Sequence, residues 1–312
     1  MTEATASGRS GFVAIVGRPN VGKSTLLNAL LGEKIAITSP RPQTTRRRVL
    51  GVLTRPDCQV VFLDTPGWHE AEHALGRLML ESAKAAMEEA DVIVMVVDGR
   101  SRLTDADRRV LERLNAFRGQ VRPGGRPVRM ILAVNKADVA RKPDLLPLME
   151  AGMKTGLFEE CVPLSALTGE QVDVLLRLII DRLPPGPRWY EPEQRTDQPV
   201  RLRVAELVRE QVLRATRQEI PHAVAVLVDT MDDEGALTRI QATILVERDG
   251  QKAIVIGRGG SMLKAIGTAA RLELERLLGR KVFLGLWVKV AEGWRTNERL
   301  LRELGYFEPG ER

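Results

Sequence analysis

The chain has 312 residues, of which 44% are hydrophobic and 28% charged, and its formal net charge is +6. This length predicts about two globular domains with sizeable cores, and two cysteines indicate no disulfide framework. The polar start of the chain lacks the apolar stretch of a signal peptide, and no apolar run approaches the roughly 18 residues of a membrane span, so we expect a cytoplasmic protein.

A glycine-rich loop follows the first strand-like run, Phe12–Val16, and precedes a helix predicted over Thr25–Leu31. Its G-x-x-x-x-G-K-S pattern, in a strand–loop–helix context, is typical of a phosphate-binding loop. The glycines let backbone N–H groups close around phosphate oxygens, the lysine reaches the terminal phosphates, and the serine hydroxyl is placed to bind Mg²⁺. The predicted phosphate-binding residues are Gly17, Arg18, Pro19, Asn20, Val21, Gly22, Lys23 and Ser24.

A second phosphate-facing segment, D-T-P-G, comes directly after the strand-like Val60–Leu63. An aspartate there can hold Mg²⁺ through a water, and the glycine N–H can meet the γ-phosphate. The segment 38–48 is then the predicted first switch, in which Thr44 or Thr45 completes the Mg²⁺ shell, with Thr45 favoured. The predicted residues are Asp64, Thr65, Pro66 and Gly67 for phosphate, and Ser24, Thr45 and Asp64 for Mg²⁺.

The base is predicted from N-K-A-D, which ends the apolar run Met130–Val134. Guanine presents two adjacent donors, and the carboxylate of Asp138 can accept both, whereas adenine presents an acceptor at the same edge. The sequence therefore favours GTP and GDP over adenine nucleotides. The predicted guanine-binding residues are Asn135, Lys136 and Asp138, with Ser165, Ala166 and Leu167 from a further loop.

A proline-rich stretch beginning at Pro184 divides the chain into two domains. Before it, apolar runs alternate with helical patterns, which predicts an α/β fold with a mostly parallel sheet and helices on both faces. We expect a G domain over 8–184, a linker over 185–199 and a smaller α+β domain over 200–308. The elements expected in the second domain are a helix (201–216), a strand (221–230), a turn (231–235), a strand (237–247), a helix (261–278), a strand (282–290) and a helix (296–304).

The motif G-R-G-G precedes the long helix of the second domain. A lone G-x-x-G is weak, but the surrounding order of helix, two strands, glycine loop, helix and strand is typical of a KH domain, whose loop clamps an RNA backbone. From Arg258 to Lys289 seven basic residues face two acidic ones. The predicted RNA-binding residues are Gly257, Arg258, Gly259, Gly260, Lys264 and Arg271.

Together these motifs, from roughly Ser10 to Phe307, resemble those of the bacterial Era GTPases. The resemblance implies a P-loop GTPase domain followed by a type II KH domain, GTP hydrolysis, and binding near the 3′ end of small-subunit (16S) ribosomal RNA. It also implies a role in maturing the small ribosomal subunit and peripheral contact with the inner membrane. We expect a monomer.

The residue after the D-T-P-G glycine is Trp68, where Ras-type GTPases carry a glutamine that orients the attacking water. Tryptophan cannot do this, because its only polar group is a donor. Era-like GTPases also carry a hydrophobic residue there. The resemblance further implies that Asn20 helps to hold a monovalent cation, K⁺, beside the phosphates.

Two other functions are open at this point. One is a signalling GTPase whose second domain binds protein or membrane, which predicts no RNA retention at moderate salt. The other is an RNA-binding protein whose first domain binds GTP without hydrolysing it, which turnover measurements would reveal.

Overall fold

The computed structural model describes residues 8–68, 73–122, 125–216 and 223–307. The chain folds into two compact units. Among the described residues, the first unit comprises 8–36, 45–68, 79–122 and 125–197, and the second comprises 37–44, 73–78, 198–216 and 223–307. The predicted domain limit at 308 lies outside the described residues.

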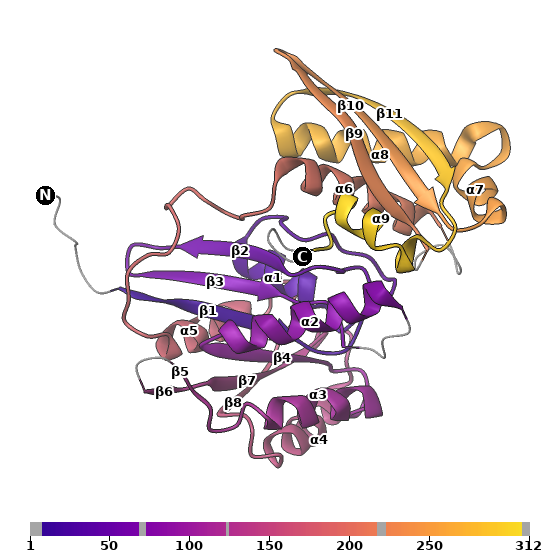
Figure 1. Cartoon of the computed structure of the whole chain (residues 1–312). Coiled ribbons are helices and arrows are strands. Elements are labelled where there is room, and N and C mark those ends of the chain that lie inside the picture. Colours follow the sequence, from indigo (N-terminus) through magenta and orange to yellow (C-terminus); the bar gives the residue numbers. More distant parts are fainter. Residues whose placement is uncertain (1–7, 69–72, 123–124, 217–222, 308–312) are drawn as a thin grey trace, which may run out of the picture. The chain divides into compact units, whose positions relative to one another are not determined.

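The first unit contains a six-stranded sheet in the order β2-β3-β1-β4-β7-β8, in which β2 alone is antiparallel to its neighbour (Figure 1). The predicted α/β class with a mostly parallel sheet is confirmed. The strands of this sheet are β1 (Arg9–Val16), β2 (Val49–Thr54), β3 (Cys58–Asp64), β4 (Val92–Asp98), β7 (Arg129–Asn135) and β8 (Glu160–Pro163). The short pair β5 (Val121–Arg122) and β6 (Arg126–Pro127) lies outside it.

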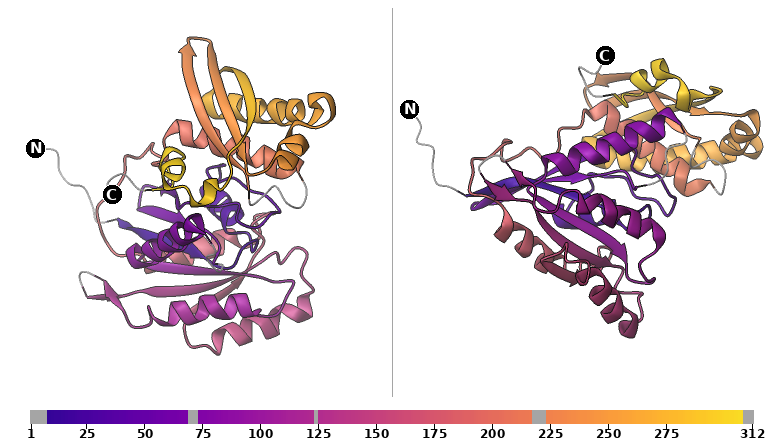
Figure 2. Two further views of the ribbon diagram at one scale, coloured as in Figure 1. Left: turned by 45° about the vertical axis from the view of Figure 1, so that its right-hand side comes forward. Right: turned by 60° about the horizontal axis from the view of Figure 1, so that its bottom comes forward.

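Helices cover both faces of this sheet (Figure 2), so its central strands are buried on both sides and read as continuous apolar runs. One apolar cluster joins α1 and α5 to the sheet, and the other joins α3, α4 and the end of α2 to the opposite face. The helices are α1 (Lys23–Leu31), α2 (Ala74–Glu89), α3 (Asp105–Asn115), α4 (Lys142–Met153) and α5 (Val172–Arg182).

The second unit packs helices on a three-stranded sheet in the order β11-β10-β9, with β10 parallel to β11 and antiparallel to β9. Alternate residues of β11 join the apolar core of this unit, so one face of the sheet carries the helices. Its elements are α6 (Val200–Ala215), β9 (Ala225–Glu234), β10 (Leu237–Val246), α7 (Asp249–Ile256), η1 (Arg258–Gly260), α8 (Ser261–Leu278), β11 (Lys281–Val290), η2 (Trp294–Thr296) and α9 (Glu298–Glu303).

The predicted turn over 231–235 is wrong, because β9 continues to Glu234 and pairs with Leu237. The acidic residues that suggested a turn are exposed and are compensated across the sheet, since Arg239 pairs with Glu234 and Arg280 with Asp233. The strand predicted over 221–230 corresponds to β9, and its first two predicted residues, 221 and 222, lie outside the described residues. The longer elements that were not predicted are β2, α4 and α7, and the short β5, β6, η1 and η2 were not predicted either.

Within the second unit, the segment Ile37–Thr44 lies on α6. Ile37 belongs to the apolar core of this unit, and the backbone N–H of Thr38 donates to the buried carboxylate of Glu210 at 2.9 Å. Arg209 donates to the carbonyl oxygen of Thr44. This part of the predicted first switch is therefore held by α6.

Candidate functional site

The phosphate-binding loop leads straight into α1, whose N-cap is Gly22 in a left-handed conformation with φ 99°. A Cβ at this position would lie 2.2 Å from Nδ2 of Asn135, so only glycine fits the approach of the two loops. No acidic side chain occupies the first turn of α1. The free N–H groups and the positive end of the helix dipole are therefore available to an anion.

Lys23 and Asp64 place opposite charges inside this site. Lys23 is buried, and its ammonium group donates to the carbonyl oxygens of Gly17 and Arg18 at 3.0 and 3.1 Å. Burial lowers the pKa of Lys23 to about 8, against the attraction of Asp64, and burial raises the pKa of Asp64 to about 6. Both shifts express the cost of charge removed from water, which a phosphate and a divalent cation would offset.

The three predicted Mg²⁺ ligands come together from three separate segments. The hydroxyl of Ser24 donates to Oδ2 of Asp64 at 2.6 Å and lies 2.7 Å from the hydroxyl of Thr45, which is 3.3 Å from the same carboxylate oxygen. The other oxygen of Asp64 is buried and has no hydrogen-bond partner among the described residues. Oxygen ligands of this kind, with an unpaired carboxylate oxygen, fit Mg²⁺. The hydroxyl of Thr44 instead donates to the carbonyl of Arg41 at 2.7 Å.

The D-T-P-G segment lies directly against the phosphate-binding loop. The hydroxyl of Thr65 donates to the carbonyl of Ile15 in β1 at 2.9 Å. A Cβ on Gly67 would lie 2.7 Å from the backbone nitrogen of Pro19, so this close approach requires glycine. The side chain of Trp68 packs against the apolar cluster of the α3 and α4 face, with the guanidinium of Arg113 5.1 Å from its ring centre.

Asn135 links three loops of the site through one buried amide. Its Nδ2 donates to the carbonyl of Val21 at 2.8 Å, and its Oδ1 accepts from the backbone N–H groups of Lys136 and Ala166 at 2.8 and 2.9 Å. Asparagine suits this position because it offers a donor and an acceptor on the same planar group. The phosphate loop, the N-K-A-D turn and the S-A-L loop are thereby fixed to one another.

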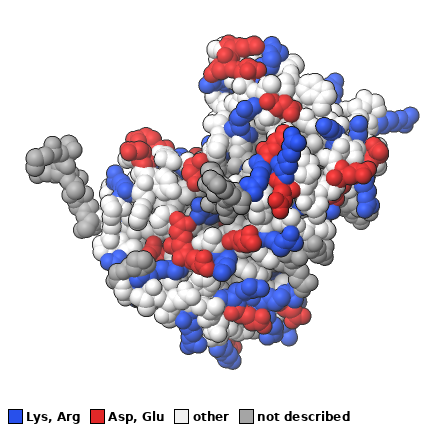
Figure 3. Space-filling model, viewed as in Figure 1, with Lys and Arg blue, Asp and Glu red and all other residues white. Residues whose placement is uncertain are grey.

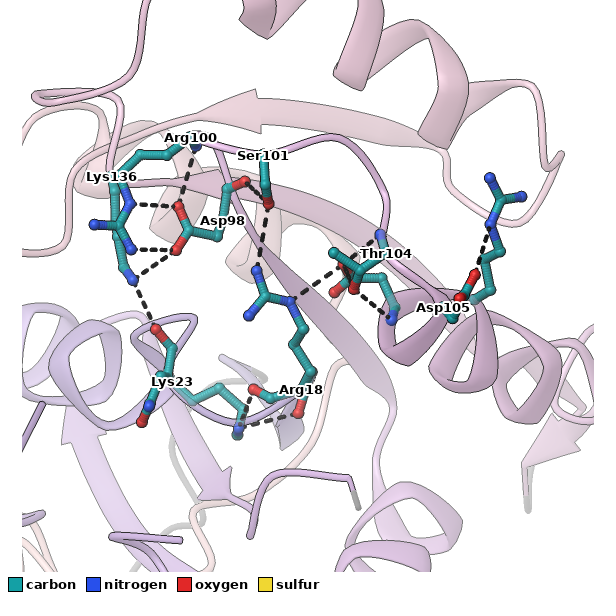
Figure 4. Close-up of polar contacts among 12 residues, drawn as sticks. Arg18, Lys23, Asp98, Arg100, Ser101, Thr104, Asp105 and Lys136 are labelled. Carbon is teal, nitrogen blue, oxygen red and sulfur yellow. Dashed lines mark hydrogen bonds and ion pairs between the residues drawn. The ribbon is translucent and has the colours of Figure 1, made fainter. Parts of the chain in front are cut away.

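Asp98, at the end of β4, was not predicted from the sequence. Its carboxylate accepts a 2.7 Å hydrogen bond from Lys136 and two from the side chain of Arg100, at 2.9 and 2.7 Å (Figure 4). Lys136 also donates to the carbonyl of Asn20 at 2.7 Å. Burial would raise the pKa of Asp98, but these hydrogen bonds hold it well below its usual value. The sequence did hold a signal for Asp98, because a carboxylate directly after an apolar strand lies at the carboxyl edge of the sheet, where ligands bind.

Arg18 directs its side chain at the start of α3 (Figure 4). Its Nε donates to Asp107 at 3.2 Å, and this buried carboxylate also receives the backbone N–H of Thr104 at 2.9 Å. The backbone N–H of Arg18 can therefore face a phosphate while its guanidinium is bound by Asp107 of α3.

The remaining guanine-binding candidates border the same edge of the sheet. Asp138 is exposed in the loop after β7. Ser165 is buried, and its hydroxyl accepts from the N–H of Thr168 at 3.2 Å, while Ala166 is nearly buried and the side chain of Leu167 is 80% exposed. The structure thus gathers all predicted nucleotide residues at the carboxyl ends of β1, β3, β7 and β8.

The G-x-x-G loop forms one end of a groove of about 430 Å³ between α8 and β11. Gly257, Gly259 and Gly260 all have positive φ, and a Cβ on Gly257 would lie 2.8 Å from the backbone nitrogen of Met262. Arg258 and Lys264 are exposed, whereas Arg271 is paired with Glu275 at 2.8 Å. The groove is lined by Gly260, Leu263, Lys264, Gly267, Thr268, Arg271, Leu284 and Leu286.

Comparison with known families matches two sequence models to the two units. Residues 12–136 match a family described as "50S ribosome-binding GTPase", and residues 219–295 match the KH domain. The chain is 47% identical to the GTPase Era of Lacticaseibacillus paracasei over 298 residues, which is 95% of this chain and 96% of that protein. The chain belongs to the Era GTPase family.

Other Era proteins are similar to this chain over nearly its whole length. The GTPase Era of Geobacter metallireducens is 46% identical over 300 residues, covering 96% of this chain and 98% of that protein. A crystal structure of Era in complex with MgGDPNP and nucleotides 1506–1542 of 16S ribosomal RNA is 42% identical, with a TM-score of 0.88 and coverage of 96% of this chain and 99% of that one. Aquifex aeolicus Era bound to GDP·AlF₄⁻, as a single-residue variant, gives a TM-score of 0.87 at 42% identity and the same coverage.

Within the part of the chain that the structure describes, no helix has both the length and the apolar character needed to cross a membrane.

Proposed function

We propose that this Era-family chain binds and hydrolyses GTP with Mg²⁺ and binds the 3′ end of 16S ribosomal RNA during maturation of the small ribosomal subunit. The observation that carries the proposal is that a relative 42% identical over almost the whole chain was crystallised with MgGDPNP and nucleotides 1506–1542 of that RNA. In support, the chain carries the predicted nucleotide-binding motifs in its first unit and a G-x-x-G groove in its second.

In the nucleotide site, the phosphates would lie at the N-terminus of α1, where free N–H groups and Lys23 neutralise their charge. Ser24, Thr45 and Asp64 would hold Mg²⁺. When bound there, the ion would supply positive charge that offsets the negative charge of the phosphate oxygens. The backbone N–H of Gly67, which lies close to Pro19, would meet the γ-phosphate.

The base would be read by Asp138, which accepts from two donors of guanine. Asn135 holds the loop that carries this carboxylate to the phosphate loop, and Lys136 is fixed by Asp98 and the Asn20 carbonyl. These hydrogen bonds would fix the loop that reads the base relative to the loop that binds the phosphates. This arrangement supports selection of GTP and GDP over adenine nucleotides.

Hydrolysis would proceed without a side chain from position 68 acting on the water, since the indole of Trp68 packs with apolar residues and Arg113. Asn20, whose left-handed backbone has φ 64°, is the proposed aid to a K⁺ ion beside the phosphates. Equal turnover in sodium and potassium would argue against such a selective cation.

In the second unit, the RNA backbone would pass the three glycines of Gly257–Gly260, with Arg258 and Lys264 offering positive charge. Arg271 lies in the same groove, and contact with a phosphate would require it to share or leave its pairing with Glu275. We also propose, from the resemblance alone, that the protein is a cytoplasmic monomer that contacts the inner membrane peripherally.

The test is ultraviolet crosslinking of the chain in its own cells, followed by sequencing of the attached RNA. The proposal predicts reads concentrated at the 3′ end of 16S ribosomal RNA, and purified chain that hydrolyses GTP but not ATP in Mg²⁺. Reads spread evenly over cellular RNA, or GTP bound without turnover, would contradict it.

A further inference from the structure

The strand β11 presents a second surface, on the face of the sheet opposite the helices. Its buried or half-buried residues at even positions join the core, while its odd positions point to the other side. These odd positions alternate basic, aromatic and glycine residues. The β11 stripe, as we name it, consists of Lys281, Phe283, Gly285, Trp287 and Lys289.

The two aromatic side chains of the stripe are unusually exposed. Phe283 is 46% exposed and Trp287 is 55% exposed, and four residues of strand place them roughly 13 Å apart. The guanidinium of Arg239, which lies opposite Phe283 on β10, is 4.8 Å from the phenyl centre. Exposed aromatic rings beside basic side chains form the kind of surface on which nucleic-acid bases can stack.

The centre of the stripe is Gly285, whose bare backbone is covered by two neighbouring side chains. A Cβ on Gly285 would lie 1.9 Å from Oε1 of Gln241 and 3.1 Å from Cζ3 of Trp287. The indole therefore leans over the bare backbone of Gly285, with Gln241 beside it. A larger residue at 285 would displace one or both of these side chains.

The stripe and the G-x-x-G groove share one strand, because β11 contributes to both of them from its opposite faces. Leu284 and Leu286 line the groove on one face of this strand, while Phe283 and Trp287 occupy the other face. β11 is an edge strand, paired only with β10, so a chain leaving the groove can turn around this edge without crossing another strand.

We propose that the β11 stripe binds single-stranded RNA that continues beyond the G-x-x-G groove, with bases stacked on Phe283 and Trp287. Every base has a face that can stack on an aromatic ring, and Lys289 places an ammonium group at one end of the stripe for phosphates. At the other end the ammonium of Lys281 lies 3.6 Å from Glu275 of α8, so contact with a phosphate would require it to leave or share this pair. The proposal rests on the RNA binding proposed above and adds a second contact region to it.

Charge on the strand itself favours RNA over a protein partner, because the stripe carries Lys281 and Lys289 and no acidic residue. The neighbouring strands bring acidic groups to the same face, where Glu234 pairs with Arg239, Asp229 accepts from Thr243, and Asp232 lies opposite Arg239. On the face drawn in Figure 3, basic and acidic side chains are interspersed, so RNA binding depends on local groups such as these.

The experiment compares two RNA lengths on the full chain. One is a five-nucleotide fragment that fills a KH groove, which clamps about four nucleotides, and the other is a twelve-nucleotide single strand, both from the 3′ end of 16S ribosomal RNA. Trp287→Ala should weaken binding of the longer RNA by about fivefold to a hundredfold, the range for one lost base stack, and leave the shorter one within twofold. Phe283→Ala should act in the same direction.

Two further variants separate stacking from folding. Trp287→Phe keeps an aromatic face and should retain most of the affinity, while losing the part of the tryptophan fluorescence quench that the longer RNA causes. Trp189→Ala removes another exposed tryptophan, in the first unit, and should change neither affinity. Melting temperatures of all variants are measured alongside.

The outcomes are distinct. Equal losses on both RNAs, or no loss on either, would overturn the proposal. A parent chain that binds neither fragment would contradict the RNA function itself. Loss confined to the longer RNA, with Trp287→Phe close to the parent, is the predicted result.

Discussion

The side-chain amide of Asn135 donates to the backbone carbonyl of Val21, 114 residues earlier in the chain, at 2.8 Å. This bond joins the loop that reads the base to the loop that holds the phosphates. The close approach is also the reason for glycine at position 22, where a Cβ would collide with the same amide. One buried polar group therefore sets the distance between the two halves of the nucleotide site.

Asn135→Ala should lower both stability and nucleotide affinity. The change leaves the carbonyl of Val21 and the N–H groups of Lys136 and Ala166 without their partner, at a cost on the order of 2–4 kcal/mol. The rise in melting temperature on adding GDP should shrink or disappear. Asn115→Ala, at an exposed asparagine of the same unit, is the control and should behave as the parent. An undiminished GDP-dependent rise in the Asn135 variant would show that the link is dispensable.

Asp138→Asn should change the base preference. An amide can donate to the 2-oxo group of xanthine, whereas it loses the paired acceptance from guanine. GTP binding should weaken by at least about 2 kcal/mol, roughly thirtyfold, and binding of xanthosine triphosphate should improve. Competition against a fluorescent GDP analogue measures both. If GTP affinity is unchanged, Asp138 is not the residue that reads the base.

Asp98→Asn should speed GDP release, because Lys136 loses its carboxylate partner and its hold on the phosphate loop loosens. The pKa of Asp98 is held below its usual value, so its contribution is fully present above about pH 4 and is lost only as pH falls through the folded pKa. The ratio of variant to parent release rates should therefore stay constant from pH 5.5 to 8.

The control for this prediction is Arg100→Ala, which removes the other cation on Asp98 but keeps the bond from Lys136. Its release rate should stay within about threefold of the parent, since the arginine is half exposed and its pair is screened by water. A release ratio for Asp98→Asn that changes tenfold across this pH range would contradict the assignment.

Trp68→Ala should change the rate of GTP hydrolysis by less than about tenfold. Removal of an electrostatic catalyst costs a hundredfold to a thousandfold, but the indole here packs with apolar residues and Arg113. Single-turnover hydrolysis in Mg²⁺ and K⁺ gives the rate without product release. A hundredfold loss with unchanged melting temperature would assign Trp68 a catalytic part.

The sequence predicted the G-domain sheet and the gathering of the nucleotide motifs because parallel strands place their carboxyl ends at one edge. It also predicted the span of α8, from Ser261 to Leu278, whose end is marked by Gly279. The glycine loop and the long helix carry strong local signals. Such elements are read from periodicity and from residues that only one backbone conformation accepts.

What the sequence missed depends on contacts between distant residues. The end of β9 carries acidic residues that suggest a turn, and only pairing with β10 and its arginine makes a strand there. Helix α7 has Asp249 and Gly250 at its start, and Gln251 supports it by accepting from the N–H groups of Glu247 and Arg248. The role of Asp98 depends on its hydrogen bonds from Lys136 and Arg100, which the sequence does not reveal. The preference for Thr45 over Thr44 as a Mg²⁺ ligand is supported only by their contacts, since the hydroxyl of Thr45 lies beside that of Ser24 and the hydroxyl of Thr44 donates to Arg41.

The central claim is that one chain hydrolyses GTP in its first unit and clamps RNA at Gly257–Gly260 in its second. Gly260→Asp would put a side chain and a negative charge where the RNA backbone must pass, at a residue with φ 78°. The decisive measurement is titration of the 16S 3′-end RNA over a salt series, with GTP hydrolysis assayed on the same preparations. Lys264→Ala serves as the milder variant and should weaken binding while reducing the salt dependence by about one phosphate contact.

The account predicts that Gly260→Asp loses RNA binding and keeps basal GTP hydrolysis within about twofold of the parent. If this variant binds the RNA as tightly as the parent does, the clamp is not at Gly257–Gly260 and the central claim is wrong.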